Sequence, residues 1–436
     1  MPNRRVLVVG TTSDYIDIIN RRFQQRAVFI TDVNERAKAA EPRPGPDVEL
    51  VCDLSGPEQV AAAVRRHLNR WQMEPSGIAC FDCESMSLAA FLAREFGLSY
   101  PSAEAVAACR SKYVSKQVWR QAGLPCPDVE LVRNASDAVN FLRRIKGPGV
   151  LKPLSGSGSE LVFLCSNEDE CVNAFGKLKS KLAKHVNRRM YAPYLFDGKK
   201  IDPRKVFVID EFVRGSEYSC DFVVEGDNVE ILRIAGKIPD QEQSFGTTLA
   251  YVMPPEHPPE LDDESFRGQL CKASRVLGLD RSICMLDFVI RDNQALMIEM
   301  TPRPGGDCLP PLLLKSCGMD ILGCTLDFAE MRPLDLPKPS KWRSLVGVRL
   351  FATHSGEISF IDSSALRKDH RVIECCLKRS SGHRVVLPPE DYDSRLLGHV
   401  IFKPSGSGDI EKECVEITSR LKVEMKTQVC ATVNSS

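Results

Sequence analysis

Two carboxylates set inside one apolar hairpin constrain this chain more than any other feature. The stretch LDFVIRDNQALMIEMTPRPGG runs from Leu286 to Gly306 and carries an Asp-Asn turn pair between two apolar runs. A turn at that pair places Asp287 opposite Glu299, with Cβ atoms about 4.5–5.5 Å apart. Like charges at this separation destabilise a sheet, so the pair needs a shared proton, a lysine or a hard divalent cation as a neutraliser.

The cation interpretation makes this hairpin a candidate metal site. Thr301 lies two residues after Glu299 and therefore shares its side of the strand. Magnesium takes oxygen ligands, so Asp287, Glu299 and Thr301 are the candidate ligands, with phosphate oxygens completing the shell. The alternative is a register slip of one or two residues that turns both acids to solvent. The opposite, core face is predicted to hold Leu286, Phe288, Ile290, Leu296, Ile298 and Met300.

A phosphate partner for such a metal is predicted in the stretch VLKPLSGSGSELVF. Lys152 ends a strand there, and Ser155–Ser159 form a loop of small residues. Glycines let backbone N–H groups wrap phosphate oxygens, and a lysine at the strand end meets the same charge. The alternative is a flexible connection, and IFKPSGSGD at 401–409, which has nearly the same letters, is interpreted as one.

The chain around these motifs divides into three parts. Short strands at 6–9, 28–32, 49–53 and 78–81 alternate with helices, a pattern typical of a parallel sheet in an α/β fold. The first strand is followed by GTTSD rather than G-x-G-x-x-G, so a scaffold or substrate-carrying domain is expected here instead of a dinucleotide site. The middle part adds strand-like runs with a basic helix at 177–190 and another helix at 262–277. A smaller β unit follows 331 and is predicted to end in a helix over 410–425.

Composition limits the partners and the compartment. Lys+Arg equals Asp+Glu at 58 each, so no overall field favours nucleic acid or acidic membranes. No apolar run approaches the roughly 18 residues of a membrane span. The 17 cysteines are scattered through apolar runs, which favours a reducing, cytoplasmic location over a disulfide scaffold. Cys80 and Cys83 form a C-x-x-C without a second pair, and zinc or redox chemistry is the minority interpretation.

Four motifs in sequence order resemble the ATP-grasp superfamily. They are Lys112 in SKYVSKQVWRQAGLPCP, Lys152 with its glycine loop, VIDEFVRGSEYSCDF, and the hairpin that ends in TPRPGG. The resemblance covers about 1–330, and 331–436 is similar to the small C-terminal domain of amino-acid ligase and biotin-carboxylase-like branches. It implies a Rossmann-like N-terminal domain at 1–108, an ATP-grasp core at 109–330 with a lid at about 125–205, and a β-rich domain at 331–436.

The same resemblance implies roles for individual residues. Asp210 and the following backbone form the adenine edge and hinge, and Glu217 binds the ribose. Arg303 and Lys152 act in catalysis, with Arg303 gripping the transferred phosphoryl group or a substrate carboxylate. The cofactors are ATP and Mg²⁺, with Mn²⁺ as an alternative ion. The implied nucleotide-binding residues are Lys112, Lys152, Ser155, Gly156, Ser157, Gly158, Ser159, Asp210, Glu211, Phe212, Val213 and Glu217.

Two positions depart from the family pattern. Thr301 stands where members of the family usually have asparagine, which makes the geometry at the second metal an open point. Leu161 stands where the glycine loop usually carries a further glycine, and a bulkier residue there tightens or displaces the lid.

The resemblance implies an ATP-dependent carboxylate–amine ligase that forms an amide or peptide bond through an acyl phosphate. The expected substrates are small molecules, an amino acid or other carboxylate plus an amine. The resemblance leaves the oligomeric state open, with a homodimer as one alternative. One alternative is a carboxylase that acts through carboxyphosphate. Another is a non-catalytic ATP-binding regulatory protein with a degenerate core.

Overall fold

The computed structural model describes residues 3–196, 198–255, 263–338, 341–406 and 408–426. The chain forms two compact units, one of Met1–Gly236 with Met253–Arg343 and the other of Lys237–Val252 with Ser344–Ser436. The three-domain division remains a prediction, and the segment 237–252 groups with the C-terminal residues. No helix among the described residues is long and apolar enough to cross a membrane.

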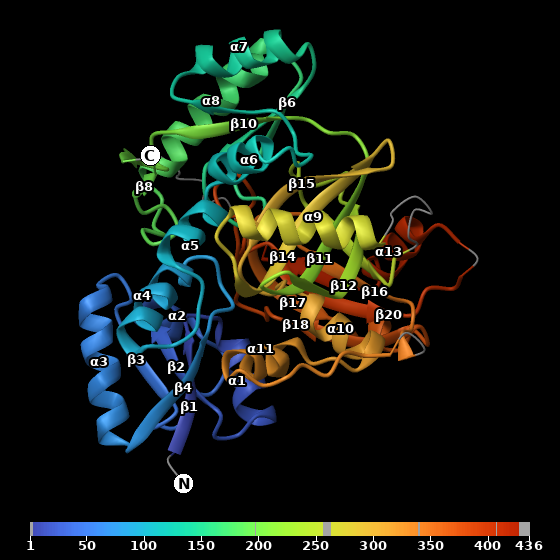
Figure 1. Cartoon of the computed structure of the whole chain (residues 1–436). Helices are drawn as coiled ribbons and strands as arrows, with labels where there is room; N and C mark the ends of the chain where they lie inside the picture. The colour runs from blue at the N-terminus through green and yellow to red at the C-terminus, as the bar shows by residue number, and fades with distance from the viewer. Residues whose placement is uncertain (1–2, 197, 256–262, 339–340, 407, 427–436) are drawn as a thin grey trace, which may run out of the picture. The chain divides into compact units, whose positions relative to one another are not determined.

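The first unit begins with the predicted parallel sheet. Its strands pair in the order β3-β2-β1-β4, all parallel, and Figure 1 shows its helices beside it in blue. The turn after β1 contains Gly10 at φ +70°, where a Cβ would overlap Asp82 and Ser85. The elements are β1 (Asn3–Val9), α1 (Ser13–Arg22), β2 (Ala27–Asp32), α2 (Val33–Lys38), β3 (Glu49–Cys52), α3 (Pro57–Arg70), β4 (Met73–Ala79), α4 (Met86–Phe96) and α5 (Ala103–Arg110).

A second, antiparallel sheet carries the glycine loop. Its order is β5-β10-β6-β7, and α7 and α8 lie together near β6 and β10 (Figure 1). The basic helix predicted at 177–190 is wrong in its bounds: α8 begins at Glu168 because Asn167 caps it, and it ends at Ala183. The elements are α6 (Lys112–Gln121), β5 (Val129–Val132), α7 (Ala135–Ile145), β6 (Gly149–Pro153), β7 (Phe163–Cys165), α8 (Glu168–Ala183), β8 (Tyr194–Phe196), β9 (Lys199–Ile201) and β10 (Phe207–Glu211).

The hairpin with the two acids lies in a larger antiparallel sheet. Within the first unit its strands pair in the order β15-β14-β11-β12, and α9 lies across one face of them (Figure 1). Phe266 and Leu270 of α9 pack there against Phe288 in the main apolar core. The elements are β11 (Ser216–Glu225), β12 (Asn228–Pro239), α9 (Asp263–Val276), β14 (Arg281–Arg291), β15 (Gln294–Thr301), α10 (Leu309–Cys317) and α11 (Ile321–Ala329).

The second unit is the predicted β-rich module. Strands β16, β20 and β18 are neighbours, and β17 pairs with β19 and β21. The helix predicted over 410–425 is wrong in its second half, because Val423 and Met425 of strand β21 alternate into the core, with Leu421 just before the strand packed there too. The elements are β13 (Thr248–Met253), β16 (Leu345–Phe351), β17 (Gly356–Asp362), α12 (Ser364–Arg367), β18 (Val372–Leu377), β19 (Arg384–Val385), β20 (Leu396–Phe402), α13 (Ile410–Thr418) and β21 (Lys422–Met425).

Candidate active site

The hairpin has the predicted register, with Asp287 directly opposite Glu299. The register shifts by one residue just beyond this pair, so Phe288 faces Met297 and Ile298 is the extra residue of a β-bulge. The assignment of Leu296 and Ile298 to the core face is therefore wrong. Both side chains belong to an apolar cluster outside the main core, on the same face as the two acids.

Lys112 joins three of the predicted motifs. It is the first residue of α6, which Ser111 caps by accepting a hydrogen bond from the backbone of Val114. Its Nζ donates to Glu299 Oε1 at 3.0 Å and to the carbonyl oxygen of Gly156 at 3.1 Å. One ammonium group thus links the helix, the glycine loop and the hairpin, and it supplies the lysine neutraliser for one of the paired carboxylates.

A second cluster forms around the buried carboxylate of Asp210. Its Oδ2 lies 2.5 Å from Lys152 Nζ and 3.1 Å from Lys116 Nζ, while its Oδ1 has no hydrogen-bond partner among the described residues. Burial acts to raise the pKa of Asp210, but the two ammonium groups hold that pKa below its ordinary value. The side chain predicted at the adenine edge is therefore directed toward Lys152 and Lys116.

The same electrostatics act on Glu299. Burial acts to raise its pKa, and Lys112, followed by Lys152 and Lys116, brings that pKa below the ordinary value. Three ammonium groups thus face two carboxylates in this region, with Asp287 beside them. The three lysines gathered here suit a polyanionic ligand.

Lys116 is a site residue that the sequence interpretation missed. It is fully buried, one helical turn after Lys112, and the i, i+4 spacing was the available signal. Burial lowers the pKa of Lys116 to about 8, although Asp210 opposes the shift. Its neutral form is thus accessible near physiological pH.

This depressed pKa predicts a pH-dependent stability. Between about pH 8 and the ordinary value of 10.5 the unfolded chain holds the Lys116 proton and the native protein does not. Stability from this group therefore rises with pH across that window, by up to about 3 kcal/mol. We expect the difference in free energy of unfolding between the wild type and Lys116→Met, measured by urea titration, to shift in favour of the wild type by this amount as the pH rises across that window. A pH-independent difference would contradict the assignment.

The glycine loop is held at one end and has a left-handed backbone at several positions. Ser155 is buried and donates from Oγ to the carbonyl oxygen of Met190 at 3.0 Å. Gly158, Ser159 and Leu161 have φ values of +66°, +59° and +56°. Leu161 thus has the backbone conformation that glycine adopts at no cost, which accounts for the glycine expected there. Its side chain is buried, so packing compensates for the strain.

Thr301 bears on whether the hairpin fits a magnesium ion. Its Oγ1 is buried and has no hydrogen-bond partner in the described part of the chain, an arrangement that a metal or a metal-bound water would complete. It lies on the same side as Glu299, whose Oε1 bonds Lys112. These residues fit an ion that keeps several water or phosphate ligands. Among the described residues no group of three or more His, Cys, Asp or Glu forms a metal cluster.

The predicted adenine hinge borders the apolar cluster. Val213 is buried against Val289 and Leu296, with Ile298 packed beside them. Glu217 is exposed and pairs across the strands with Val289, so its side chain lies at the edge of this cluster. The cluster and the acid pair occupy one face of the sheet, an apolar patch next to a charged one. The backbone N–H of Phe212 donates to Pro148, and Glu211 pairs with Arg291.

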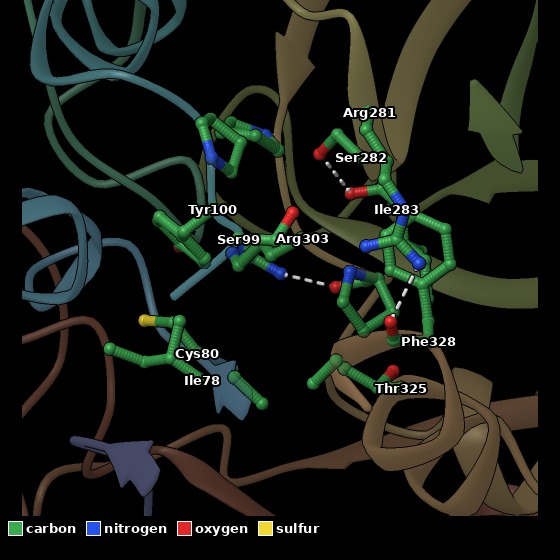
Figure 2. Close-up of a pocket in the computed structure, with 15 residues that line it drawn as sticks. Ile78, Cys80, Ser99, Tyr100, Arg281, Ser282, Ile283, Arg303, Thr325 and Phe328 are labelled. Carbon is green, nitrogen blue, oxygen red and sulfur yellow. Dashed lines mark hydrogen bonds between the residues drawn. The ribbon is translucent and has the colours of Figure 1, made fainter. Parts of the chain in front are cut away.

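Arg303 forms a contact with the loop between β4 and α4 that no sequence pattern indicated. Its Nε and Nη2 donate to Cys83 Sγ at 3.1 and 3.0 Å, and its Nη1 donates to the carbonyl oxygen of Pro304 at 2.8 Å. Burial raises the pKa of the Cys83 thiol, and Arg303 opposes that shift. Arg303 also lines a cavity together with Tyr100 and Phe328 (Figure 2). Cys83, the second cysteine of the C-x-x-C motif, therefore orients the Arg303 side chain.

A buried ion pair lies beneath the loop that carries Arg303. Arg233 donates to both carboxylate oxygens of Asp221 at 2.8 and 2.9 Å, and both side chains are almost completely buried. The backbone N–H of Gly305 donates to Asp221 Oδ1 at 3.0 Å. Through Asp221, Arg233 is thus a structural partner of the loop.

This packing predicts a cost for Gly305→Ala. A Cβ at Gly305 would overlap Arg233 Nη2 and come within 2.9 Å of Leu309 Cδ1, whereas at Gly306 the nearest atoms are 3.9 Å away. We expect Gly305→Ala to lower the free energy of unfolding by about 1–3 kcal/mol, and Gly306→Ala to lower it much less. If both variants lost the same free energy of unfolding in urea, the Arg233 side chain would be able to move away from the new methyl group without strain.

Comparisons with known proteins agree with this geometry. The family model for the ATP-grasp domain matches residues 145–311. The D-alanine–D-alanine ligase of Delftia acidovorans is 25% identical over 258 residues, 56% of this chain and 72% of the relative. An uncharacterized protein, y4rH of Sinorhizobium fredii, is 26% identical over 283 residues, 62% of this chain and 52% of its own length. The chain thus spans about half the length of that relative.

A solved structure resembles the chain over its full length. The L-amino acid ligase from Bacillus licheniformis superposes with a TM-score of 0.78 at 17% identity, covering 98% of this chain and 100% of that one. The fold is therefore the ATP-grasp fold, and the chain contains an ATP-grasp domain, as the order of the motifs predicted.

Proposed function

We propose that this ATP-grasp protein is an ATP-dependent carboxylate–amine ligase that joins an amino acid to an amine or a second amino acid. The observation that carries the proposal is the convergence of Lys112, Lys116 and Lys152 on Asp210 and Glu299, beside an apolar cluster. The lysines suit the phosphates of ATP and the apolar cluster suits its adenine ring. The D-alanine–D-alanine ligase and the L-amino acid ligase to which this chain is similar support the choice of reaction.

The chemistry proceeds in two displacements. A carboxylate oxygen attacks the γ-phosphorus of ATP, the bond to ADP breaks, and an acyl phosphate forms. The amine then attacks the acyl carbon, phosphate leaves, and the amine proton passes to a base or to solvent. A loose phosphoryl transition state is stabilised mainly by positioned charge, which the buried lysines and Arg303 supply.

Within this proposal the residues have separate roles. Lys112 and Lys152 bind phosphate oxygens, and the loop of Ser155–Ser159 covers them. Asp287, Glu299 and Thr301 would hold magnesium, which when bound would supply further positive charge to the phosphates. Arg303 binds the carboxylate that is activated. Exclusion of water by the glycine loop keeps the acyl phosphate from hydrolysis.

Phosphate release from ATP and Mg²⁺ tests the proposal. The purified full chain is assayed with the proteinogenic amino acids, singly and in pairs, and products are identified by mass spectrometry. We expect release only with a productive pair, together with ADP and a condensed amide. ATP binding measured by calorimetry without release for any pair would instead support a nucleotide-binding regulatory protein. Release that needs bicarbonate would support the carboxylase alternative.

A further inference from the structure

The first turn of α1 places a phenol in the region of Arg303. Tyr15 is 8% exposed, and its ring packs edge-on against Phe81 with centroids 6.0 Å apart. Its hydroxyl is buried and has no hydrogen-bond partner among the residues described. A buried hydroxyl without a hydrogen-bond partner lowers the stability of the fold. A bound ligand that accepts or donates a hydrogen bond here would remove this penalty.

The position of Gly306 relates this hydroxyl to the arginine. The point that a Cβ on Gly306 would occupy lies 3.9 Å from Tyr15 Oη and 3.9 Å from Arg303 Nη1. Both donors therefore border the same small space above the loop. A guanidinium has five N–H groups, and Arg303 uses three of them within the described structure, which leaves two for a ligand.

A carboxylate from the same loop acts on the Tyr15 hydroxyl. Asp307 follows Gly306 directly and has φ +60°, a left-handed conformation that aspartate adopts more readily than most residues. Burial raises the pKa of Tyr15, Asp14 and Asp307 add to that shift, and Arg303 opposes it. Charges of both signs thus act on the Tyr15 hydroxyl.

We propose that Tyr15, Arg303 and Asp307 form a subsite for an α-amino acid. The guanidinium and the phenol hydroxyl donate to its carboxylate, and Asp307 binds its ammonium group. This inference rests on the proposed ligase function and names the substrate whose carboxylate is activated. A des-amino carboxylic acid satisfies the two donors but has no ammonium group for Asp307 to bind, so the subsite selects for the amine.

Calorimetry on the full chain loaded with Mg²⁺ and a non-hydrolysable ATP analogue tests the subsite. The probes are the individual proteinogenic L-amino acids and the des-amino counterpart of the tightest binder. We expect Tyr15→Phe, which keeps the ring, to weaken amino-acid binding by roughly 10-fold. Asp307→Asn should weaken binding of the amino acid and leave binding of the des-amino acid unchanged.

Two control variants make the same substitutions at positions outside the proposed subsite. Asp292→Asn alters an exposed aspartate that also has a positive φ, of +50°, and Tyr392→Phe removes a phenol hydroxyl from the second unit. Both should bind like the wild type. Unchanged affinity in Tyr15→Phe, or an equal loss for both probes in Asp307→Asn, would overturn the subsite.

The subsite and the ligase proposal fail separately. A wild type that binds no amino acid but releases phosphate with another carboxylate overturns the subsite and leaves the ligase. A wild type that binds an amino acid, with the expected response of both variants, but never releases phosphate supports the subsite and overturns the ligase.

Discussion

Lys152→Met is expected to reduce substrate-dependent phosphate release by at least about 100-fold, the scale on which positioned charge stabilises a transition state. The lysine is almost completely buried and its Nζ lies 2.5 Å from Asp210 Oδ2. Its loss removes a phosphate-binding charge and also leaves Asp210 paired, among the described residues, with Lys116 alone. We therefore expect weaker ATP binding together with a lower turnover number.

The chain contains its own control for this variant. Lys403 occupies the corresponding place in IFKPSGSGD but is exposed in the second unit, between β20 and α13. Lys403→Met changes the same residue type in nearly the same local sequence, and it should leave phosphate release and ATP affinity unaltered. If the two variants released phosphate at the same rate, Lys152 would not be a phosphate-binding residue, and the loop after it would have no better claim to bind phosphate than the 401–409 connection.

The contrast between these two loops shows what the local sequence can predict. Turn chemistry and alternation placed Asp287 opposite Glu299 correctly, because a hairpin register depends on residues close together in sequence. The bulge at Ile298 lies in the same strand and escaped prediction, since an extra residue leaves no mark in the apolar pattern. This single extra residue places the side chains of Leu296 and Ile298 on the face opposite to the one predicted.

Contacts between distant segments were out of reach for a further reason. Cys83 and Arg303 are 220 residues apart, and nothing in either neighbourhood indicates a thiol as the acceptor for an arginine. Lys116 differs, because its spacing from Lys112 pointed to the same helix face and was overlooked.

Glu299→Gln is the second substitution with a large expected effect. The change preserves shape but removes the charge that Lys112 bonds at 3.0 Å and that the surrounding lysines stabilise. Without it the hairpin offers magnesium one carboxylate, so we expect substrate-dependent phosphate release to fall at least about 100-fold and to need more Mg²⁺ for half-maximal rate.

A matched change on the same sheet separates charge loss at the site from charge loss in general. Glu225 bonds Arg281 at 2.9 Å and is half exposed, so Glu225→Gln should retain both the rate and the Mg²⁺ requirement, because exposed ion pairs contribute little. If Glu299→Gln slowed release while the Mg²⁺ requirement stayed fixed, Glu299 would act through Lys112 rather than as a metal ligand. Because the two roles predict different Mg²⁺ titrations, the rate alone does not decide between them.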